Sequence, residues 1–280
     1  MSKRLRVAIA CPGIGLVSRG FERFFSDLKT ALRGPLEVTL FKGGGPNAPD
    51  EQIPAFLPRN GWFLKSVPLH RLIGRTPMHV ECLTYALGLL PHLAGGRFDI
   101  VHTIDPPLAR ILFHLRRWLH LDFHLLETEA TAMPAKDYPP SDHIHQVSLQ
   151  TLQRAISHGY DPEKMTLLPC GIDCEHFRTS EDRRDLRKRY GISPSTFVVL
   201  SIAALNRYHK RIHYLIDEFS RLQGDCLLWL DGSMDNGDSD LPGYALKKLG
   251  SRCRITHVPS NQVRDLYKMS DIKVLASTHE

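Results

Sequence analysis

The most concentrated group of anion-binding side chains lies in residues 206–211, which include Arg207, Lys210 and Arg211. An apolar run that predicts a strand precedes this segment, and apolar residues at helical spacing follow it. Open α/β sheets bind their ligands where strands end and helices begin. Cations beside a helix N-terminus suit a pyrophosphate, because the charges and the helix dipole both favour anions. A solvated basic turn is the alternative interpretation.

The glycine-containing loop of residues 12–20 is a second candidate anion site. It is not a dinucleotide-binding fingerprint, because Ser18 stands where the third glycine is required. It is not a P-loop either, because Phe21 occupies the position of the lysine. The loop leads into an expected helix, where backbone amides and the helix dipole favour an anion. A tight turn explains the same residues.

No group of residues has the spacing of a metal site. Residues 238–240 (Asp-Ser-Asp) imitate an Asp-x-Asp metal motif, but the surrounding composition predicts a polar surface loop. The histidine pairs 120/124 and 143/145 have no carboxylate or cysteine at ligand spacing, which indicates core or surface histidines. The six cysteines are scattered and suit reduced thiols. We therefore expect no bound metal and a cytoplasmic protein.

These candidate residues need strands and helices that bring them to common edges. Short apolar runs alternate with segments of helical periodicity, which predicts an α/β fold with helices on both faces of parallel sheets. The expected strands are residues 6–11, 36–41, 98–103, 123–127, 143–148, 165–169, 196–203, 226–230, 254–258 and 272–276. The expected helices are residues 21–32, 80–93, 108–121, 150–157, 212–222, 244–249 and 262–269.

Length and composition indicate two domains. The chain has 280 residues, of which 42% are hydrophobic and 24% charged, as in ordinary globular proteins. We expect a first Rossmann-like domain over residues 1–165, a junction over 166–195 and a second Rossmann-like domain over 196–280. The charged stretch 181–190 lacks a periodic apolar face, which predicts a solvated helix at the boundary. Residues 46–78 predict a long surface loop with short helices.

The net charge of +6 favours anionic partners, among them phosphates, nucleic acid and anionic membranes. Basic residues before an apolar run at the N-terminus resemble a signal peptide. That run breaks at Pro12 and Gly13 without a cleavage site, so a first buried strand is the better interpretation. No stretch reaches the roughly 18 apolar residues of a transmembrane helix.

Several segments resemble, in order, those of the retaining family 4 glycosyltransferases, also called group 1 glycosyl transferases, which have the two-domain GT-B fold. Residues 167–177 resemble the family's Pro-x-Gly-hydrophobic-Asp-x3-Phe signature at the domain junction. Residues 201–219 resemble its phosphate-binding strand and helix, and residues 266–280 the segment leading to its Glu-x7-Glu donor motif. The other similar segments are 18–28 (glycine loop and first helix), 98–102 (the strand before the acceptor cleft) and 228–232 (a strand with a glycine turn).

The resemblance implies transfer of a sugar from a nucleotide-diphosphate sugar to an acceptor, with retention at the anomeric carbon and without a metal or other cofactor. Without a metal, cations and helix N-termini must stabilise the departing diphosphate. The nucleotide sugar is then a co-substrate. The acceptor is a lipid-linked intermediate, a polysaccharide or a small molecule, and the sequence does not decide among them.

Site residues follow from the same resemblance. Lys210 matches the family's phosphate-contacting lysine, and Glu280 matches the first glutamate of Glu-x7-Glu, which contacts the donor sugar; these two are the catalytic candidates. Gly20 matches the glycine-loop position near the donor phosphates, and Arg19 and Val258 complete the donor side. The candidates on the acceptor side are Gly15, His102 and Glu129.

The chain departs from the family pattern at three places. The arginine usually found five residues before the lysine is Leu205 here, and we expect Arg207 or Arg211 to replace it. The usual double glycine of the first loop is Arg19-Gly20. The chain stops at Glu280, so the second glutamate is absent, and its end directly after an expected buried strand suggests the N-terminal part of a longer enzyme.

Other functions remain open at this point. A related GT-B enzyme such as a sugar-nucleotide epimerase shares the architecture without transferring to an acceptor. A nucleic-acid-binding protein would interleave aromatic residues with its basic patch, but only Tyr208 lies within the cationic cluster, so we expect no nucleic-acid partner. Peripheral contact with the inner membrane surface is suggested by Arg110, Arg116, Arg117 and Trp118, although a core helix with a basic edge explains them better.

Overall fold

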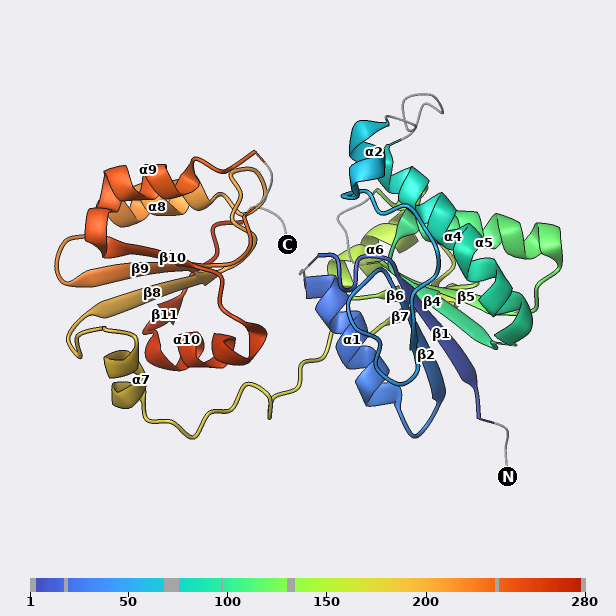
Figure 1. The fold of residues 1–280 in the computed structure, drawn as a ribbon, viewed down its shortest axis with the longest axis horizontal. Coiled ribbons are helices and arrows are strands. Elements are labelled where there is room, and N and C mark those ends of the chain that lie inside the picture. The colour runs from blue at the N-terminus through green and yellow to red at the C-terminus, as the bar shows by residue number, and fades with distance from the viewer. Residues whose placement is uncertain are drawn as a thin grey trace. The chain divides into compact units, whose positions relative to one another are not determined.

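The computed structural model describes residues 4–17, 20–67, 76–96, 98–129, 134–234 and 237–277. The chain folds into two compact units that divide between Ile172 and Asp173. Each unit is a parallel β-sheet with helices packed on both faces (Figure 1). The predicted α/β class is confirmed.

In the described part of the first unit, the sheet has the order β3-β2-β1-β4-β5-β6-β7. Its strands are β1 (Arg6–Cys11), β2 (Glu37–Lys42), β3 (Glu51–Gln52), β4 (Ile100–Thr103), β5 (His124–Glu129), β6 (His143–Gln146) and β7 (Met165–Leu167). Its helices are α1 (Gly20–Leu32), α2 (Trp62–Ser66), α4 (Pro77–Gly96), α5 (Pro106–Leu119) and α6 (Leu149–Ser157). The chain winds outward from β1 to β3 and then returns to β4 on the other side of β1.

The residues of β1 alternate between two layers of the core. Val7 and Ile9 pack with Phe25 of α1 on one face of the sheet. Ala8 and Ala10 belong to the cluster on the other face, which holds the larger side chains of α4 and α5. Small residues on that face leave room for the two helices. Each large apolar side chain buried in this way contributes about 1.5–3 kcal/mol to the free energy of unfolding.

In the described part of the second unit, the sheet has the order β10-β9-β8-β11. Its strands are β8 (Phe197–Ile202), β9 (Cys226–Asp231), β10 (Cys253–Thr256) and β11 (Ile272–Lys273). Its helices are α7 (Arg183–Arg189), α8 (Ile212–Ser220), α9 (Leu241–Leu249) and α10 (Val263–Met269). Helices α8 and α9 cover one face of this sheet, and α7 and α10 lie on the other (Figure 1).

Two sequence expectations about the second unit are wrong. The charged stretch 181–190 is not simply a solvated helix, because Leu186 of α7 is fully buried and Arg187 is only 5% exposed. The guanidinium of Arg187 donates to the carboxylate of Asp271 at 2.7 Å and to backbone carbonyl oxygens, among them that of Met269 at 2.9 Å. A long-range partner thus makes burial of a charge possible. The expected buried strand 272–276 is reduced to the two exposed residues of β11.

An ion-pair cluster holds the loop after β2 beside the glycine loop after β1. Glu51 accepts hydrogen bonds from Lys29 at 2.7 Å and from Lys42 at 2.5 Å, and both lysines are 5% exposed. Burial alone raises the pKa of Glu51, but the two lysines outweigh it and lower the pKa to about 2. The anchored loop of residues 43–50 donates two backbone hydrogen bonds to the carbonyl oxygen of Ile14, each at 3.0 Å.

We predict that Glu51→Gln lowers the free energy of unfolding by about 3 kcal/mol at neutral pH, because two buried lysines lose their counter-charge. The folded pKa of Glu51, about 2, lies below its ordinary value of 4.5, so this contribution is present above about pH 4.5 and is lost as the pH falls toward 2. Urea unfolding at several pH values measures the difference.

Asp50→Asn is the matched control, because Asp50 pairs with Arg33 through a side chain that is 60% exposed. The control is expected to cost less than about 1 kcal/mol. Equal losses for both variants would contradict the importance of the buried cluster.

Candidate functional site

The second sheet changes winding direction at β8, since β9 and β10 lie on one side of it and β11 on the other. Open α/β sheets bind ligands outside the carboxyl ends of strands at such a switch point. Residues 203–211, which contain the cationic cluster predicted from the sequence, directly follow the carboxyl end of β8. The topology therefore places this cluster where a ligand is expected.

The side chain of Asn206 shapes the turn that carries these cations. Asn206 is 6% exposed, and its Oδ1 accepts hydrogen bonds from the backbone N–H groups of His209 at 2.9 Å and Lys210 at 2.8 Å. Its carbonyl oxygen accepts from the N–H of Ile212, the first residue of α8, at 3.1 Å. One buried amide thus ties the loop after β8 to the start of α8.

Lys210 and Arg211 end this turn at the helix N-terminus. Arg211 is the residue that precedes α8, and its φ of 49° lies in the left-handed region, which costs a non-glycine residue on the order of 1 kcal/mol. Its side chain does not cap the helix; the guanidinium lies 4.3 Å from the ring centre of Tyr214. The positive end of the α8 dipole therefore lies beside two cationic side chains.

Arg207 is held by carboxylates of a neighbouring loop. Its guanidinium forms an ion pair with Asp240 at 2.5 Å and approaches Asp238 at 3.5 Å. It also lies 5.3 Å from the ring centre of Tyr244. The two aspartates that imitate a metal motif thus neutralise an arginine on the neighbouring loop.

The departure at Leu205 has a structural counterpart. Leu205 is 1% exposed and packs in the core with α8 and α9, so its side chain does not reach the loop surface. Of the two arginines expected to replace the family's arginine, Arg211 forms no ion pair within the described residues, whereas Arg207 is bound by carboxylates.

Val258 lies at the same edge of the sheet, after β10. Asp231, which ends β9 and is 2% exposed, accepts a hydrogen bond from the backbone N–H of Val258 at 2.9 Å. Gly232 follows with a φ of 152°, and a Cβ on it would lie 1.9 Å from the carbonyl oxygen of Ala203. Only glycine allows this approach of the loops after β8 and β9. The structure therefore brings Arg207, Lys210, Arg211 and Val258 to loops at one sheet edge.

The switch point of the first sheet lies between β1 and β4, where the glycine loop follows β1. Gly15 has a φ of 82°, and a Cβ there would lie 2.1 Å from the carbonyl oxygen of Gly44, so this glycine is required for packing. Gly20 begins α1, and a Cβ on it would meet nothing within 4 Å. Arg19 lies outside the described residues, as does Glu280.

His102 lies inside the first unit and is 4% exposed. Burial, and to a smaller extent the neighbouring His145, lower the pKa of His102 to about 3, so its imidazole is neutral. Its Nε2 lies 2.7 Å from Thr128 Oγ1, which lies 3.0 Å from His145 Nδ1. His145 Nε2 donates to the carbonyl oxygen of Leu168 at 2.5 Å. This chain of hydrogen bonds ties β4, β5 and β6 to the segment after β7.

Glu129 ends β5 and is fully buried, as is Glu127 two residues earlier on the same face. Both carboxyl oxygens of Glu127 lack a hydrogen-bond partner within the described residues. Burial, and then the charge of Glu129, raise the pKa of Glu127 well above its ordinary value, so this carboxyl is neutral. Glu127 is not among the residues predicted from the sequence, although an acidic residue in an apolar strand was a signal.

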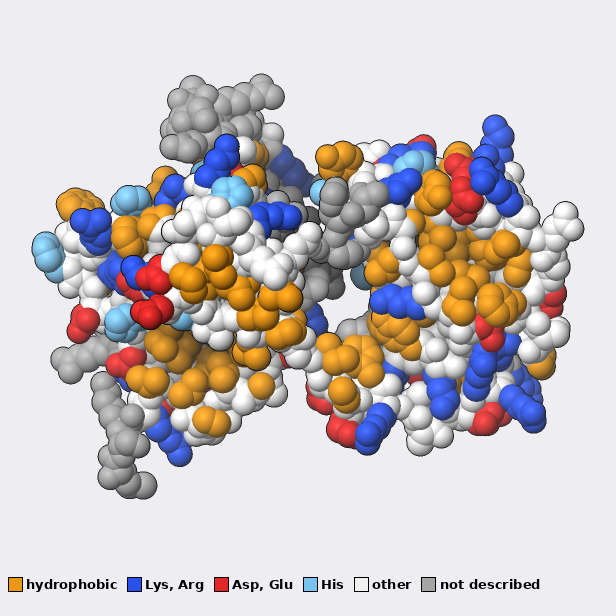
Figure 2. All heavy atoms as spheres, turned by 180° about the vertical axis from the view of Figure 1, so that it is seen from behind, with side chains coloured by type: hydrophobic (Ala, Val, Ile, Leu, Met, Phe, Trp, Pro, Cys, Tyr) orange, Lys and Arg blue, Asp and Glu red, His pale blue; other side chains and the backbone are white. Residues whose placement is uncertain are grey.

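Helix α5, with its basic edge, packs on the core through Leu108 and Leu112. Arg116 is bound by the carboxylate of Asp142, while Trp118 is 75% exposed. Lys and Arg side chains on the face shown in Figure 2 are scattered among acidic and hydrophobic ones. In the part of the chain that is described, no helix has the length and apolar character to cross a membrane, and no cluster of His, Cys, Asp and Glu suits a metal ion.

No protein-family model and no curated protein sequence matches the chain. Solved structures are similar to it over nearly its whole length. Sucrose-phosphate synthase from Thermosynechococcus elongatus has a TM-score of 0.73 and 16% identity, over 99% of this chain and 76% of that one. HepE from Anabaena in complex with UDP-glucose has a TM-score of 0.69 and 14% identity, over 98% and 74%.

The catalytic domain of starch synthase IV from Arabidopsis thaliana, bound to ADP and acarbose, has a TM-score of 0.72 and 15% identity, over 100% of this chain and 79% of that one. At sequence identities this low, the similarity to these structures shows the fold alone. The chain therefore has the GT-B fold of these proteins, which confirms the fold predicted from the sequence.

We predict that Glu127→Gln stabilises the protein increasingly as the pH rises. Because the folded pKa lies above the ordinary value of 4.5, the folded state keeps a proton that the unfolded chain releases. The free energy of unfolding of the wild type then falls by about 1.4 kcal/mol for each pH unit in that window. Thermal unfolding between about pH 5 and about pH 8 measures the growing difference.

The exposed carboxylate of Glu37 offers a control, since its side chain is 60% exposed. For Glu37→Gln we expect a difference from the wild type that stays nearly constant above about pH 6. A constant difference for Glu127→Gln as well would show that Glu127 is ionised in the folded protein.

Proposed function

We propose that this chain belongs to a glycosyltransferase that moves a sugar from a nucleotide-diphosphate sugar to an acceptor hydroxyl. One observation carries the proposal: in a chain of GT-B fold, Lys210, Arg211 and the N-terminus of α8 meet at the switch point of the second sheet. The similar HepE structure is in complex with UDP-glucose, and the starch synthase structure is bound to ADP. The negative charge of a nucleotide diphosphate complements the positive charge of Lys210 and Arg211.

The diphosphate of the donor would lie against the turn of residues 206–212. As the bond from the anomeric carbon to the diphosphate oxygen breaks, negative charge develops on that oxygen. Lys210, Arg211 and the α8 dipole stabilise this charge without reorganising, because the Asn206 hydrogen bonds already hold the turn. In this proposal they take the place of a metal ion. The backbone of Val258, whose N–H donates to Asp231, would lie beside the nucleoside of the bound donor.

Retention of configuration follows if the acceptor attacks from the side that the diphosphate leaves. The acceptor oxygen then forms its bond to the anomeric carbon, and its proton passes to an oxygen of the departing phosphate. No carboxylate base is needed for this step. We also propose that the chain belongs to family 4. In that family the residue that Glu280 matches contacts the donor sugar, and Glu280 has that role in this proposal.

The acceptor would bind at the carboxyl edge of the first sheet, where the loop with Gly15 and Gly20 follows β1 and Glu129 ends β5. The neutral carboxyl of Glu127 and the buried Glu129 lie on one face of β5. His102 supports this edge through its hydrogen bonds. The acceptor would be a lipid-linked intermediate, a polysaccharide or a small molecule.

We predict that Lys210→Ala weakens binding of UDP and UDP-glucose about 10- to 100-fold, because one charge-assisted contact to a phosphate is lost. Calorimetric titration of the purified chain measures the affinity. Lys247→Ala is the control, because Lys247 is an exposed lysine on α9 and is expected to leave affinity unchanged. Absence of binding of UDP-, ADP- and GDP-sugars by the unaltered protein would overturn the proposed function.

The two arginines are expected to differ. Arg211→Ala should weaken UDP binding by about 10-fold or more, whereas Arg207→Ala should change it by less than about 3-fold, because Asp238 and Asp240 already occupy Arg207. The same titration distinguishes them. Unchanged affinity in both variants would leave the missing family arginine without a replacement.

A further inference from the structure

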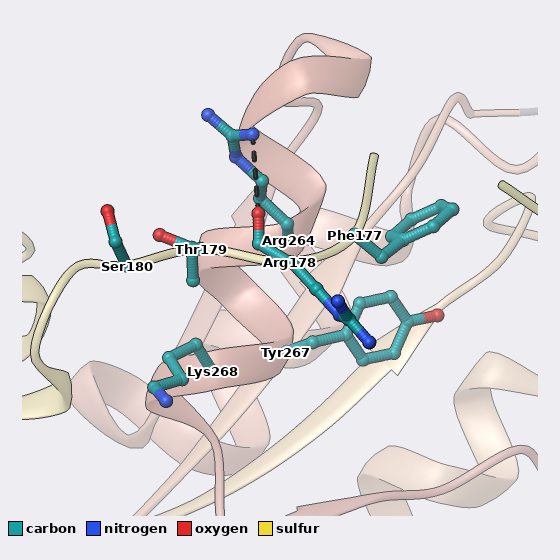
Figure 3. Close-up of a pocket in the computed structure, with 7 residues that line it drawn as sticks. All are labelled: Phe177, Arg178, Thr179, Ser180, Arg264, Tyr267 and Lys268. Atoms are coloured by element: carbon teal, nitrogen blue, oxygen red, sulfur yellow. Dashed lines mark hydrogen bonds between the residues drawn. The ribbon is translucent and has the colours of Figure 1, made fainter. Parts of the chain in front are cut away.

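A basic pocket lies in the second unit, away from the turn of residues 206–212. It has a volume of about 580 Å³ and is lined by Phe177, Arg178, Thr179, Ser180, Arg264, Tyr267 and Lys268. Figure 3 shows the segment 177–180 passing across α10, which carries the other three residues. We call this the α10 pocket. Its volume is in the range of sites that bind small molecules.

The α10 pocket belongs to the helix layer opposite the candidate donor site. Leu266 and Met269 of α10 pack against the side of the sheet that holds Trp229. Ile212 and Leu215 of α8 pack against the other side. A ligand of the α10 pocket therefore lies across the sheet from the turn that carries Lys210.

Cations and hydroxyl groups dominate the lining, which includes no carboxylate among the residues that the structure describes. Arg264 and Lys268 supply positive charge, and Thr179 and Ser180 supply hydroxyl donors. Arg178 is already paired with the exposed carboxylate of Glu175 at 2.8 Å. The Nε of Arg264 is buried without a hydrogen-bond partner in the described structure, and the nearest carboxylate oxygen, from Asp265, is 4.0 Å away. Nη1 of the same guanidinium donates to the carbonyl oxygen of Arg178 at 3.5 Å, so Nε is the donor that an anionic ligand of the pocket would pair with.

Two aromatic rings form an apolar wall of the pocket. The centres of Phe177 and Tyr267 are 6.3 Å apart at an angle of 77°, and both side chains are 40% exposed. Exposed rings beside cations suit a ligand with an anionic group and a ring, because the cations bind phosphate oxygens while the aromatic faces cover apolar surface. Inorganic phosphate has no ring and would not contact the two aromatic side chains.

We propose that the α10 pocket binds a small phosphate monoester that carries a ring. The phosphate lies among Arg264, Lys268 and the hydroxyl groups of Thr179 and Ser180. The ring of the ligand packs against Phe177 and Tyr267. This site is independent of the proposed donor site and does not require that the chain be a glycosyltransferase.

Phenyl phosphate is a direct probe, titrated by calorimetry into the whole chain with and without excess UDP. We expect binding that UDP does not displace. Arg264→Gln and Lys268→Gln should each weaken it about 10-fold or more, because each removes one charged contact. Tyr267→Leu should weaken binding of phenyl phosphate but leave that of inorganic phosphate nearly unchanged.

Arg221→Gln is the matched control, because Arg221 directly follows α8 on the other helix layer and its side chain is 72% exposed. It should leave phenyl phosphate affinity unchanged. Three results would overturn the proposal: no binding by the unaltered chain, equal weakening by Arg221→Gln, or displacement by UDP. Binding of the chain to vesicles of phosphatidylglycerol is measured as well. If the chain binds the vesicles but not phenyl phosphate, the proposal is overturned and these cations bind a membrane surface instead. Circular dichroism of each variant verifies that it is folded.

Discussion

The buried side chain of Asn206 is the constraint on which the candidate donor site depends. Its amide oxygen accepts two backbone N–H groups of the turn, and its carbonyl oxygen accepts the first N–H of α8. These bonds hold Arg211 in a left-handed conformation that it would not favour alone. Without them Lys210 and Arg211 would have no fixed position relative to the helix dipole. Preorganisation of this kind is what electrostatic stabilisation of a leaving group needs.

The same physical device recurs at the other loops of this sheet edge. Asp231 holds the backbone of Val258, and Gly232 lets the loops after β8 and β9 meet without a Cβ between them. In the first unit the buried Glu51 cluster holds the loop that supports the glycine loop. Polar side chains from the strands thus satisfy loop backbone groups, and the loops keep a defined shape for a ligand.

The sequence predicted the strands and helices well, because the alternation of apolar runs and helical periods reflects local geometry. It also placed Lys210 and Arg211 at a strand-to-helix turn, since that position depends only on neighbouring elements. Contacts between distant residues were beyond such reasoning. Burial of Arg187 depends on Asp271, and neutralisation of Arg207 depends on Asp238 and Asp240. The protonation of Glu127 likewise depends on the helices that cover β5.

Amide hydrogen exchange of the whole chain with and without saturating UDP reports which backbone groups the nucleotide covers, and so tests whether UDP binds at the turn of residues 206–212. We expect slower exchange with UDP in residues 206–214, which form the turn and the start of α8, and at Val258 in the loop after β10. Protection confined to other segments, or none in residues 206–214, would contradict the assignment of this sheet edge as the nucleotide site.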